Sequence, residues 1–139
     1  DPEAMNVLCL MRTDFLKVCD QIIGGTLSKN SVEFEELSTV CKYAVPNGYP
    51  NKPAKGFVVD CKIEDLDVYL ASVKSSGGRV VACGSRTAAA IGKDKNVFVA
   101  EKFAERKISS IGGDLFHRKD IGTKELISRR IDRMEKILR

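Results

Sequence analysis

The sequence predicts an α/β fold, with a small, mainly parallel sheet of about three or four strands and crossover helices. Two N-terminal helices precede this core and a C-terminal amphipathic helix follows it. Two observations predict this architecture. After residue 56, short apolar runs alternate with segments of helical periodicity, which is typical of βαβ units. Near both ends of the chain, apolar residues recur at the helical spacing of three and four.

The size and composition are those of one ordinary globular domain. The chain has 139 residues, of which 43% are hydrophobic and 30% charged. We expect a single domain over 1–139, with a helical part at 1–45, a proline-rich loop at 46–56 and a βαβ core with the final helix at 57–139. No run approaches the ~18 apolar residues of a membrane helix, and no stretch resembles a signal peptide. These features predict a cytoplasmic protein without a membrane partner.

The cysteines and the single histidine exclude the common metal frameworks. The five cysteines are widely spaced, without a C-x-x-C pair, and His117 is the only histidine. Zinc sites and redox motifs need close pairs, so we predict reduced thiols and no metal site. Asp60-Cys61-Lys62 resembles the acid and lysine pattern of metal-dependent nucleases, but the further acid that such a site needs is missing. No motif identifies a cofactor.

Helix signals dominate the first 45 residues. Asp1 and Pro2 are typical of a helix start, and the apolar spacing predicts one helix that ends at Gly24-Gly25. A second helix is predicted from Asn30 to Ala44, because Glu33 completes a capping box.

The core is predicted as alternating strands and helices. Strands are expected at 57–61, 79–83 and 96–100, with a fourth at 108–111. Helices are expected between them: one whose apolar stripe is Ile63, Leu66, Leu70 and Val73, a short alanine-rich one that begins at 84–87, and one at 101–107. Thr123 is predicted to cap the C-terminal helix, whose apolar stripe is Ile127, Ile131, Met134 and Leu138.

The first candidate site is the turn after the second predicted strand. In open parallel sheets, ligands bind beyond the carboxyl ends of the strands, and a helix N-terminus there attracts anions. Gly84 permits close backbone approach, while Ser85, Arg86 and Thr87 supply donors for a phosphate. Asp60, at the end of the neighbouring strand, is expected to face the same crevice. This pattern predicts a binding site for a phosphate-bearing small molecule, such as a nucleotide or a related metabolite.

The alternative is a nucleic-acid-binding module. Residues 101–139 hold 11 basic and 7 acidic residues, so this segment carries the whole net charge of +4. Basic side chains on one helix face contact phosphates without reading bases. The candidates are Arg118, Lys119, Arg129, Arg130, Arg133 and Lys136.

A third possibility is an interaction protein without a ligand. The apolar stripes of the terminal helices must be buried, and a second copy of the chain would cover them. We therefore expect a homodimer or another homo-oligomer.

Overall fold

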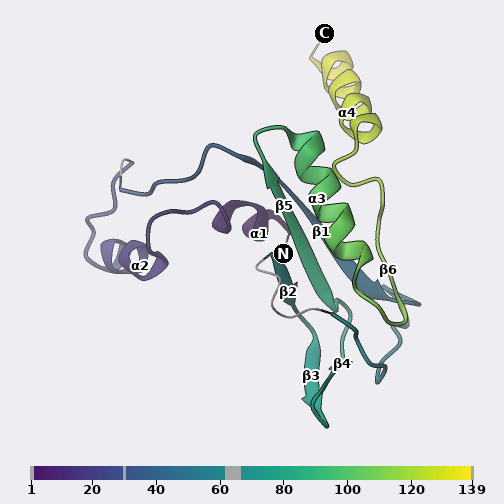
Figure 1. The fold of residues 1–139 in the computed structure, drawn as a ribbon. Helices are drawn as coiled ribbons and strands as arrows, with labels where there is room; N and C mark the ends of the chain where they lie inside the picture. The colour runs from purple at the N-terminus through teal and green to yellow at the C-terminus, as the bar shows by residue number, and fades with distance from the viewer. Residues whose placement is uncertain (1, 30, 62–66, 139) are drawn as a thin grey trace.

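The computed structural model describes residues 2–29, 31–61 and 67–138. Figure 1 shows the helices and strands that these residues form. In chain order they are α1 (Pro2–Leu8), α2 (Phe15–Ile23), β1 (Ser38–Pro46), β2 (Val68–Leu70), β3 (Val73–Ser76), β4 (Arg79–Ala82), β5 (Ala88–Asp94), α3 (Val97–Ser109), β6 (Leu115–Phe116) and α4 (Lys124–Ile137).

One four-stranded sheet and one hairpin organise the described residues. The sheet has the order β2-β5-β1-β6, and β3 pairs with β4 separately. β1 and β5 pair along seven residue pairs, whereas β6 reaches β1 only at Val45 and Pro46. Most of the outer edge of β1 therefore has no strand beside it in the part of the chain that the structure describes.

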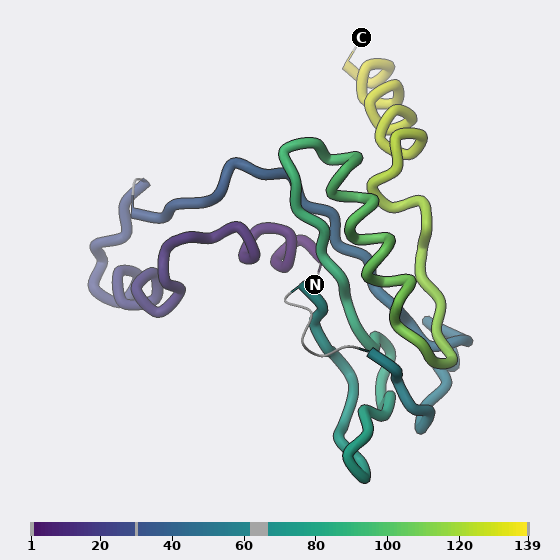
Figure 2. Tube along the Cα trace, in the orientation of Figure 1, coloured from purple at the N-terminus to yellow at the C-terminus, as the bar shows by residue number. Residues whose placement is uncertain are grey.

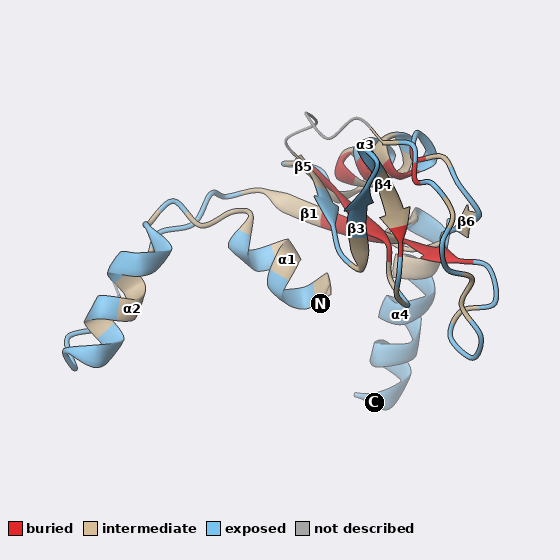
Figure 3. Cartoon of the chain, turned by 90° about the horizontal axis from the view of Figure 1, so that it is seen from below, coloured by how far each residue is buried: buried red, intermediate tan, exposed pale blue. Residues whose placement is uncertain are grey.

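α3 covers one face of the sheet at very short range. Its buried residues, Ala100, Ala104 and Ile108, pack against β1 and β5. Gly92 of β5 shows how close the packing is, because a Cβ placed there would lie 1.8 Å from the Ala100 carbonyl oxygen. Figure 3 shows that the buried residues concentrate in β1, β5 and α3.

The opposite face of the sheet is only lightly covered. Cys41, Ala89 and Ile91 form its buried cluster, with Met5 and Cys9 from the α1 region packed against them. α1 itself contains no buried residue. This face is therefore closed by partly exposed side chains.

α2 and α4 lie outside the packed core. Neither helix has a buried residue, and Ile23 at the end of α2 is 85% exposed. The tube in Figure 2 shows the α1–α2 segment extending away from the sheet before the chain returns to β1, and α4 projecting beyond α3. None of the helices in the described residues combines the length and apolar character needed to cross a bilayer.

The predicted parallel sheet is wrong, because the strand pairs among the described residues are all antiparallel. A strand at Arg79–Ala82 is confirmed, but its partner is β3 rather than a parallel strand. Gly77 and Gly78 form the tight turn between them with φ angles of 56° and 73°. Two glycines with positive φ are typical of a two-residue hairpin.

Two predicted helices are strands. The segment predicted as a helix up to Ala44 contains β1, and the alanine-rich segment after Thr87 is β5. β1 is buried on both faces, so its apolar residues carry no period of two, and their helical spacing is coincidental. The alanines of β5 lie where the sheet meets α3, and the close packing outweighs their helix propensity. Asn30, the predicted start of the first of these helices, lies outside the described residues.

The segment predicted as a helix at 63–73 also differs. Val68–Leu70 and Val73–Ser76 are strands. Ile63 and Leu66 lie outside the described residues, as does Lys62 of the nuclease-like pattern. The strand predicted at 57–61 is not a regular strand. Val58 and Asp60 each form one isolated β-bridge, to Val81 and to Gly112.

The predicted strands at 96–100 and 108–111 are wrong, because α3 occupies 97–100 of the first segment and 108–109 of the second. Asn96 is the N-cap of α3 and accepts a hydrogen bond from the Phe98 N–H. The helix expected at 101–107 is confirmed as part of α3. The single N-terminal helix is instead two helices, since Asp14 caps α2 after a break. Asp1, its predicted cap, lies outside the described residues.

Several local predictions are confirmed. Thr123 caps α4 by accepting a hydrogen bond from the Leu126 N–H, and Gly24 ends α2. The segment from Asn47 to Gly56 is a loop. The reduced state of the five cysteines stays a prediction; in the structure none forms a disulfide, and Cys41 alone among them is buried.

Candidate functional site

The main cavity of the described residues runs along the open edge of β1. It has a volume of about 590 Å³ and is lined mostly by apolar side chains. β1 forms its floor, α1 contributes Pro2 and Asn6, and the segment from Phe116 to Ile127 forms the far wall. A concave, apolar surface with a few polar groups is typical of a ligand site.

Arg86 supplies positive charge to this cavity. Its guanidinium lies over the Tyr43 ring, 5.3 Å from the ring centroid. A hydrogen bond with Tyr49, and a weaker one with Tyr43, raise the pKa of Arg86 above its usual value. Burial raises the pKa of the Tyr43 hydroxyl, so both partners keep their ordinary charge at neutral pH. β1 and the loop after it therefore position Arg86.

Arg118 is the second cation of the cavity wall. Its Nε and Nη2 donate to the two carboxylate oxygens of Asp120, at 3.0 and 2.6 Å. These hydrogen bonds lower the pKa of Asp120 and orient the exposed guanidinium. A fixed planar guanidinium suits a phosphate or a carboxylate.

A buried ion-pair network holds the segment that carries Arg118. The Lys42 ammonium, fully buried, donates to Glu101 at 2.7 Å, to Glu105 at 2.6 Å and to the Lys119 carbonyl at 3.0 Å. His117 Nε2 lies 3.0 Å from the other Glu105 oxygen. β1, α3 and residues 117–119 are thus joined through one ammonium group. We call these residues the Lys42 network.

Glu105 has the most strongly shifted carboxyl group of the Lys42 network. Burial alone would raise its pKa, but hydrogen bonds from Lys42 and His117 outweigh that effect and lower it to about 2. The carboxylate therefore stays ionised through the neutral range. Its role is to hold its partners rather than to transfer a proton.

Two buried polar atoms near the cavity lack partners among the described residues. They are Asn6 Oδ1, at the cavity wall, and Thr87 Oγ1, whose residue is fully buried. Unpartnered buried oxygens are uncommon in folded proteins. Asn6 Oδ1 is thus a buried acceptor beside the cavity that has no partner among the described residues.

The predicted 84–87 site is a loop between two strands, not a helix start. No helix dipole aims at it, so the physical basis of the predicted phosphate site is absent. Arg86 nevertheless lines the main cavity, Ser85 is exposed, and Gly84 packs so tightly that a Cβ would lie 2.2 Å from that of Ser72.

Asp60 does not join this loop. The segment that ends at Asp60 runs antiparallel to β4, so Gly56 rather than Asp60 lies beside Ala82, the last residue of β4. Asp60 instead bridges to Gly112. The expected shared crevice depended on parallel strands and does not form at that end of β4. No group of three or more metal-ligating side chains occurs within the described residues.

The basic residues of the alternative prediction come together in part. Arg118, Arg129, Arg130 and Arg133 line a second cavity, with a volume of about 550 Å³, beside α4. Lys119 and Lys136 do not line it. The apolar stripe of α4 is largely exposed, with Ile131 and Met134 each 52% accessible.

Lys42 and Asn6 are site residues that sequence reasoning missed. Lys42 lies in the run Val40-Cys41-Lys42-Tyr43-Ala44, and a lysine inside an apolar strand is almost never buried without carboxylate partners. That signal was available only once the run was read as a strand. Asn6 carries no signal of its own.

Comparison with known proteins identifies the family. Residues 39–124, more than half of the chain, match the family described as phosphoribosylglycinamide synthetase, C domain. The chain belongs to this family. The match begins with β1 and ends at the first residue of α4, so it includes Arg86, Arg118 and the Lys42 network.

Relatives named phosphoribosylamine–glycine ligase match nearly the whole chain. The ligase of Methanococcus maripaludis strain C7 is 46% identical over 142 residues, covering 99% of this chain and 32% of the relative. That of Methanosarcina barkeri is 45% identical over 138 residues, with the same coverage of both chains. That of Methanocaldococcus jannaschii is 41% identical over 144 residues, covering 100% of this chain and 32% of the relative. The chain thus spans about a third of the length of these relatives.

A crystal structure of phosphoribosylamine–glycine ligase from Thermotoga maritima has a similar fold. Its TM-score is 0.64 at 22% sequence identity, and the match covers 76% of this chain and 27% of that one. This likeness supports the antiparallel architecture described above.

Proposed function

We propose that this chain is the C domain of an ATP-dependent ligase that joins phosphoribosylamine to glycine. The observation that carries the proposal is the 46% identity to a phosphoribosylamine–glycine ligase across 99% of the chain. Because the chain spans about a third of that relative, the activity requires the remaining two thirds of the ligase. We propose a cytoplasmic location, the one expected from the sequence, because the relatives are enzymes that act on small metabolites.

The cavity along β1 is proposed as this domain's share of the substrate site. It is open on the side where β1 has no neighbouring strand, so another part of the ligase can close it. Phosphoribosylamine carries a phosphate and glycine a carboxylate, and Arg86 and Arg118 both suit such anions. In this proposal Arg86 retains the ligand-binding role expected for the 84–87 loop, while Gly84, Ser85 and Thr87 shape the loop that carries it. Asp60 has no role here.

A chimeric ligase tests the proposal. The third of the Methanococcus maripaludis enzyme that matches this chain is replaced by the chain itself, and the joining of glycine to phosphoribosylamine is measured with ATP present. We expect activity from the chimera and none from either part alone. An inactive chimera that is folded and binds ATP would contradict the proposed function.

Arginine variants of the chimera test the cavity. Arg86→Gln is expected to raise the KM for phosphoribosylamine or glycine by roughly tenfold, because one charge-assisted interaction is lost. Arg79→Gln removes the same charge from the exposed β3–β4 hairpin and is the control. Equal effects of the two variants would place the substrate site elsewhere.

A further inference from the structure

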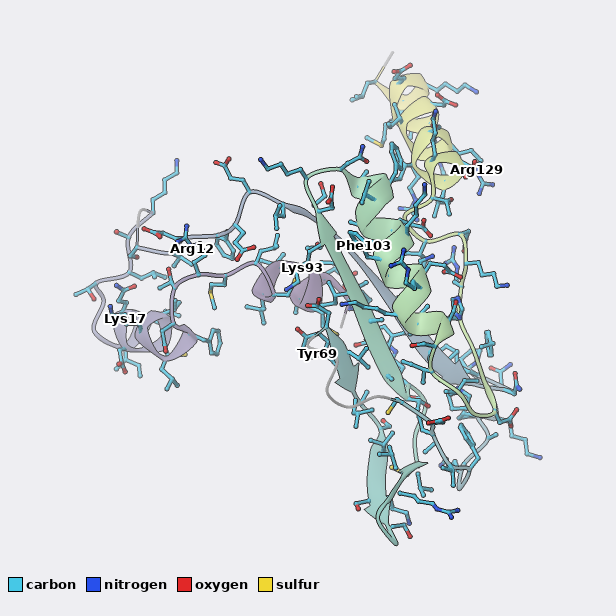
Figure 4. The ribbon with its side chains drawn as sticks, in the orientation of Figure 1. Arg12, Lys17, Tyr69, Lys93, Phe103 and Arg129 are labelled. Atoms are coloured by element: carbon cyan, nitrogen blue, oxygen red, sulfur yellow. The ribbon has the colours of Figure 1, made fainter. Side chains whose placement is uncertain are left out.

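The cavity beside α4 concentrates positive charge next to the proposed substrate site, with which it shares Arg118. Four arginines line it, and Asp120 is the one acidic residue among its lining residues. Figure 4 labels Arg129, whose side chain projects from α4. We propose that this cavity binds a compact anion that carries two or more phosphate groups.

The helix spacing produces this concentration of charge. Arg129, Arg130 and Arg133 lie at positions i, i+1 and i+4, so all three side chains reach one side of α4. Within the described residues none of the three forms an ion pair, and Arg118 is already paired with Asp120. The acidic residues of α4 itself, Glu125, Asp132 and Glu135, are not among the lining residues. Three guanidinium groups thus face one cavity whose single carboxylate, Asp120, is already paired with Arg118, and a bound anion would relieve their mutual repulsion.

The lining favours a small polyphosphate over a nucleic acid. It contains no aromatic side chain on which a base could stack, and its apolar members are Leu126 and Met134 alone. Lys119 and Lys136, which would extend a track for a longer polyanion, lie outside it. Guanidinium groups bind phosphate oxygens in pairs, so four of them can hold neighbouring phosphates. The charge and the volume of about 550 Å³ both suit a compact anion.

This site goes beyond the proposed ligase function, although Arg118 borders both cavities. α4 lies beyond residues 39–124, the part that matches the family, except for its first residue. The cavity is formed by the chain alone, so its binding can be measured without the rest of a ligase. The ligase proposal and this one therefore fail in different experiments.

Calorimetric titration of the whole chain with inorganic triphosphate tests the proposal. At about 0.15 M salt, where exposed charges are screened beyond roughly 8 Å, we expect one saturable site. The double variant Arg129→Gln with Arg133→Gln should weaken binding by roughly tenfold or more. Lys74→Gln with Arg79→Gln removes two positive charges from the exposed hairpin and should leave binding unchanged. Arg129→Lys with Arg133→Lys, which keeps the charge and loses the planar fork, should give an intermediate affinity.

Three outcomes would overturn the proposal. If the hairpin control loses as much affinity for triphosphate as the α4 variant, the anion is attracted by net charge only. A titration that does not saturate would show adventitious binding. Tighter binding of a short single-stranded RNA than of triphosphate, lost in the α4 variant, would assign the surface to nucleic acid. Circular dichroism of each variant verifies that α4 stays helical. If the glutamine variant loses helix content, the affinity of the lysine variant for triphosphate tests the proposal instead.

Discussion

At the scale of single residues, Lys42 connects the fold to the candidate site. Its ammonium has three acceptors and is fully buried, so within the described part of the chain its charge is balanced by Glu101 and Glu105 alone. The same two carboxylates would repel each other without it. The position of Arg118 thus depends on a residue in the middle of β1.

We expect Lys42→Met to destabilise the fold by about 3 kcal/mol, because two partly buried carboxylates lose their counter-ion. Urea unfolding measures the change. Lys102→Met, at an exposed position of α3, is the control and should have little effect. A loss of stability in the control as large as that in the Lys42 variant would contradict this account of the network.

The ionised Glu105 carboxylate is expected to make the free energy of unfolding sensitive to acid. Its folded pKa of about 2 lies below the unfolded value of 4.5, so the folded state favours the ionised form. The stabilisation is therefore present above pH 4.5 and is lost as the pH falls from 4.5 towards about 2. Urea midpoints measured over this range should fall less steeply with acid in Glu105→Gln. Glu125→Gln, at an exposed position, is the control, and its urea midpoint should depend on pH as steeply as that of the unchanged protein. The same pH dependence in all three proteins would refute the prediction.

At the scale of elements, the packing of α3 on β5 decides the architecture. Gly92 opposes the backbone of Ala100 so closely that any side chain must push the two elements apart. The neighbouring alanines serve the same close approach. This contact also places Glu101 and Glu105 above Lys42.

Gly92→Ala is expected to destabilise the protein by about 1–3 kcal/mol or more, because the overlap involves backbone on both sides. Thermal unfolding measures the cost. Gly112→Ala is the matched control, since a Cβ there would lie 3.2 Å from the Asp60 Cβ and needs only a small adjustment. A Gly92 variant as stable as the control would show that α3 can shift without cost.

At the scale of the whole molecule, the exposed apolar helices indicate missing contacts. Leu16 and Ile23 of α2 are 73% and 85% exposed, so they contribute little to the packing within this chain. Since the relatives are about three times longer, the proposed ligase offers a surface that would cover α2. The homodimer expected from the sequence would cover it as well.

A double variant separates these two partners. Leu16→Gln with Ile23→Gln should leave the melting temperature of the isolated chain nearly unchanged, and lower that of the chimeric ligase by several degrees. Lys17→Gln with Asp20→Asn, on the same helix, should change neither. If the variant instead halves the mass of the isolated chain in sedimentation, α2 is the surface of a homodimer.

The sequence by itself determined the features that depend on neighbouring residues. Thr123 caps α4, Gly24 ends α2, and the prolines and glycines of 47–56 form a loop, because capping and turn formation are local. It also located the basic residues of 118–133, although not the cavity that they share.

Tertiary structure decided the rest, for one physical reason. β1 and β5 are buried on both faces, so their apolar residues show no alternation, and their identity as antiparallel partners depends on α3. The turn at Gly77-Gly78 is a hairpin only because strands lie on both sides of it. Arg86 and Arg118 are 32 positions apart in the chain, and only the folded sheet brings them to the same cavity.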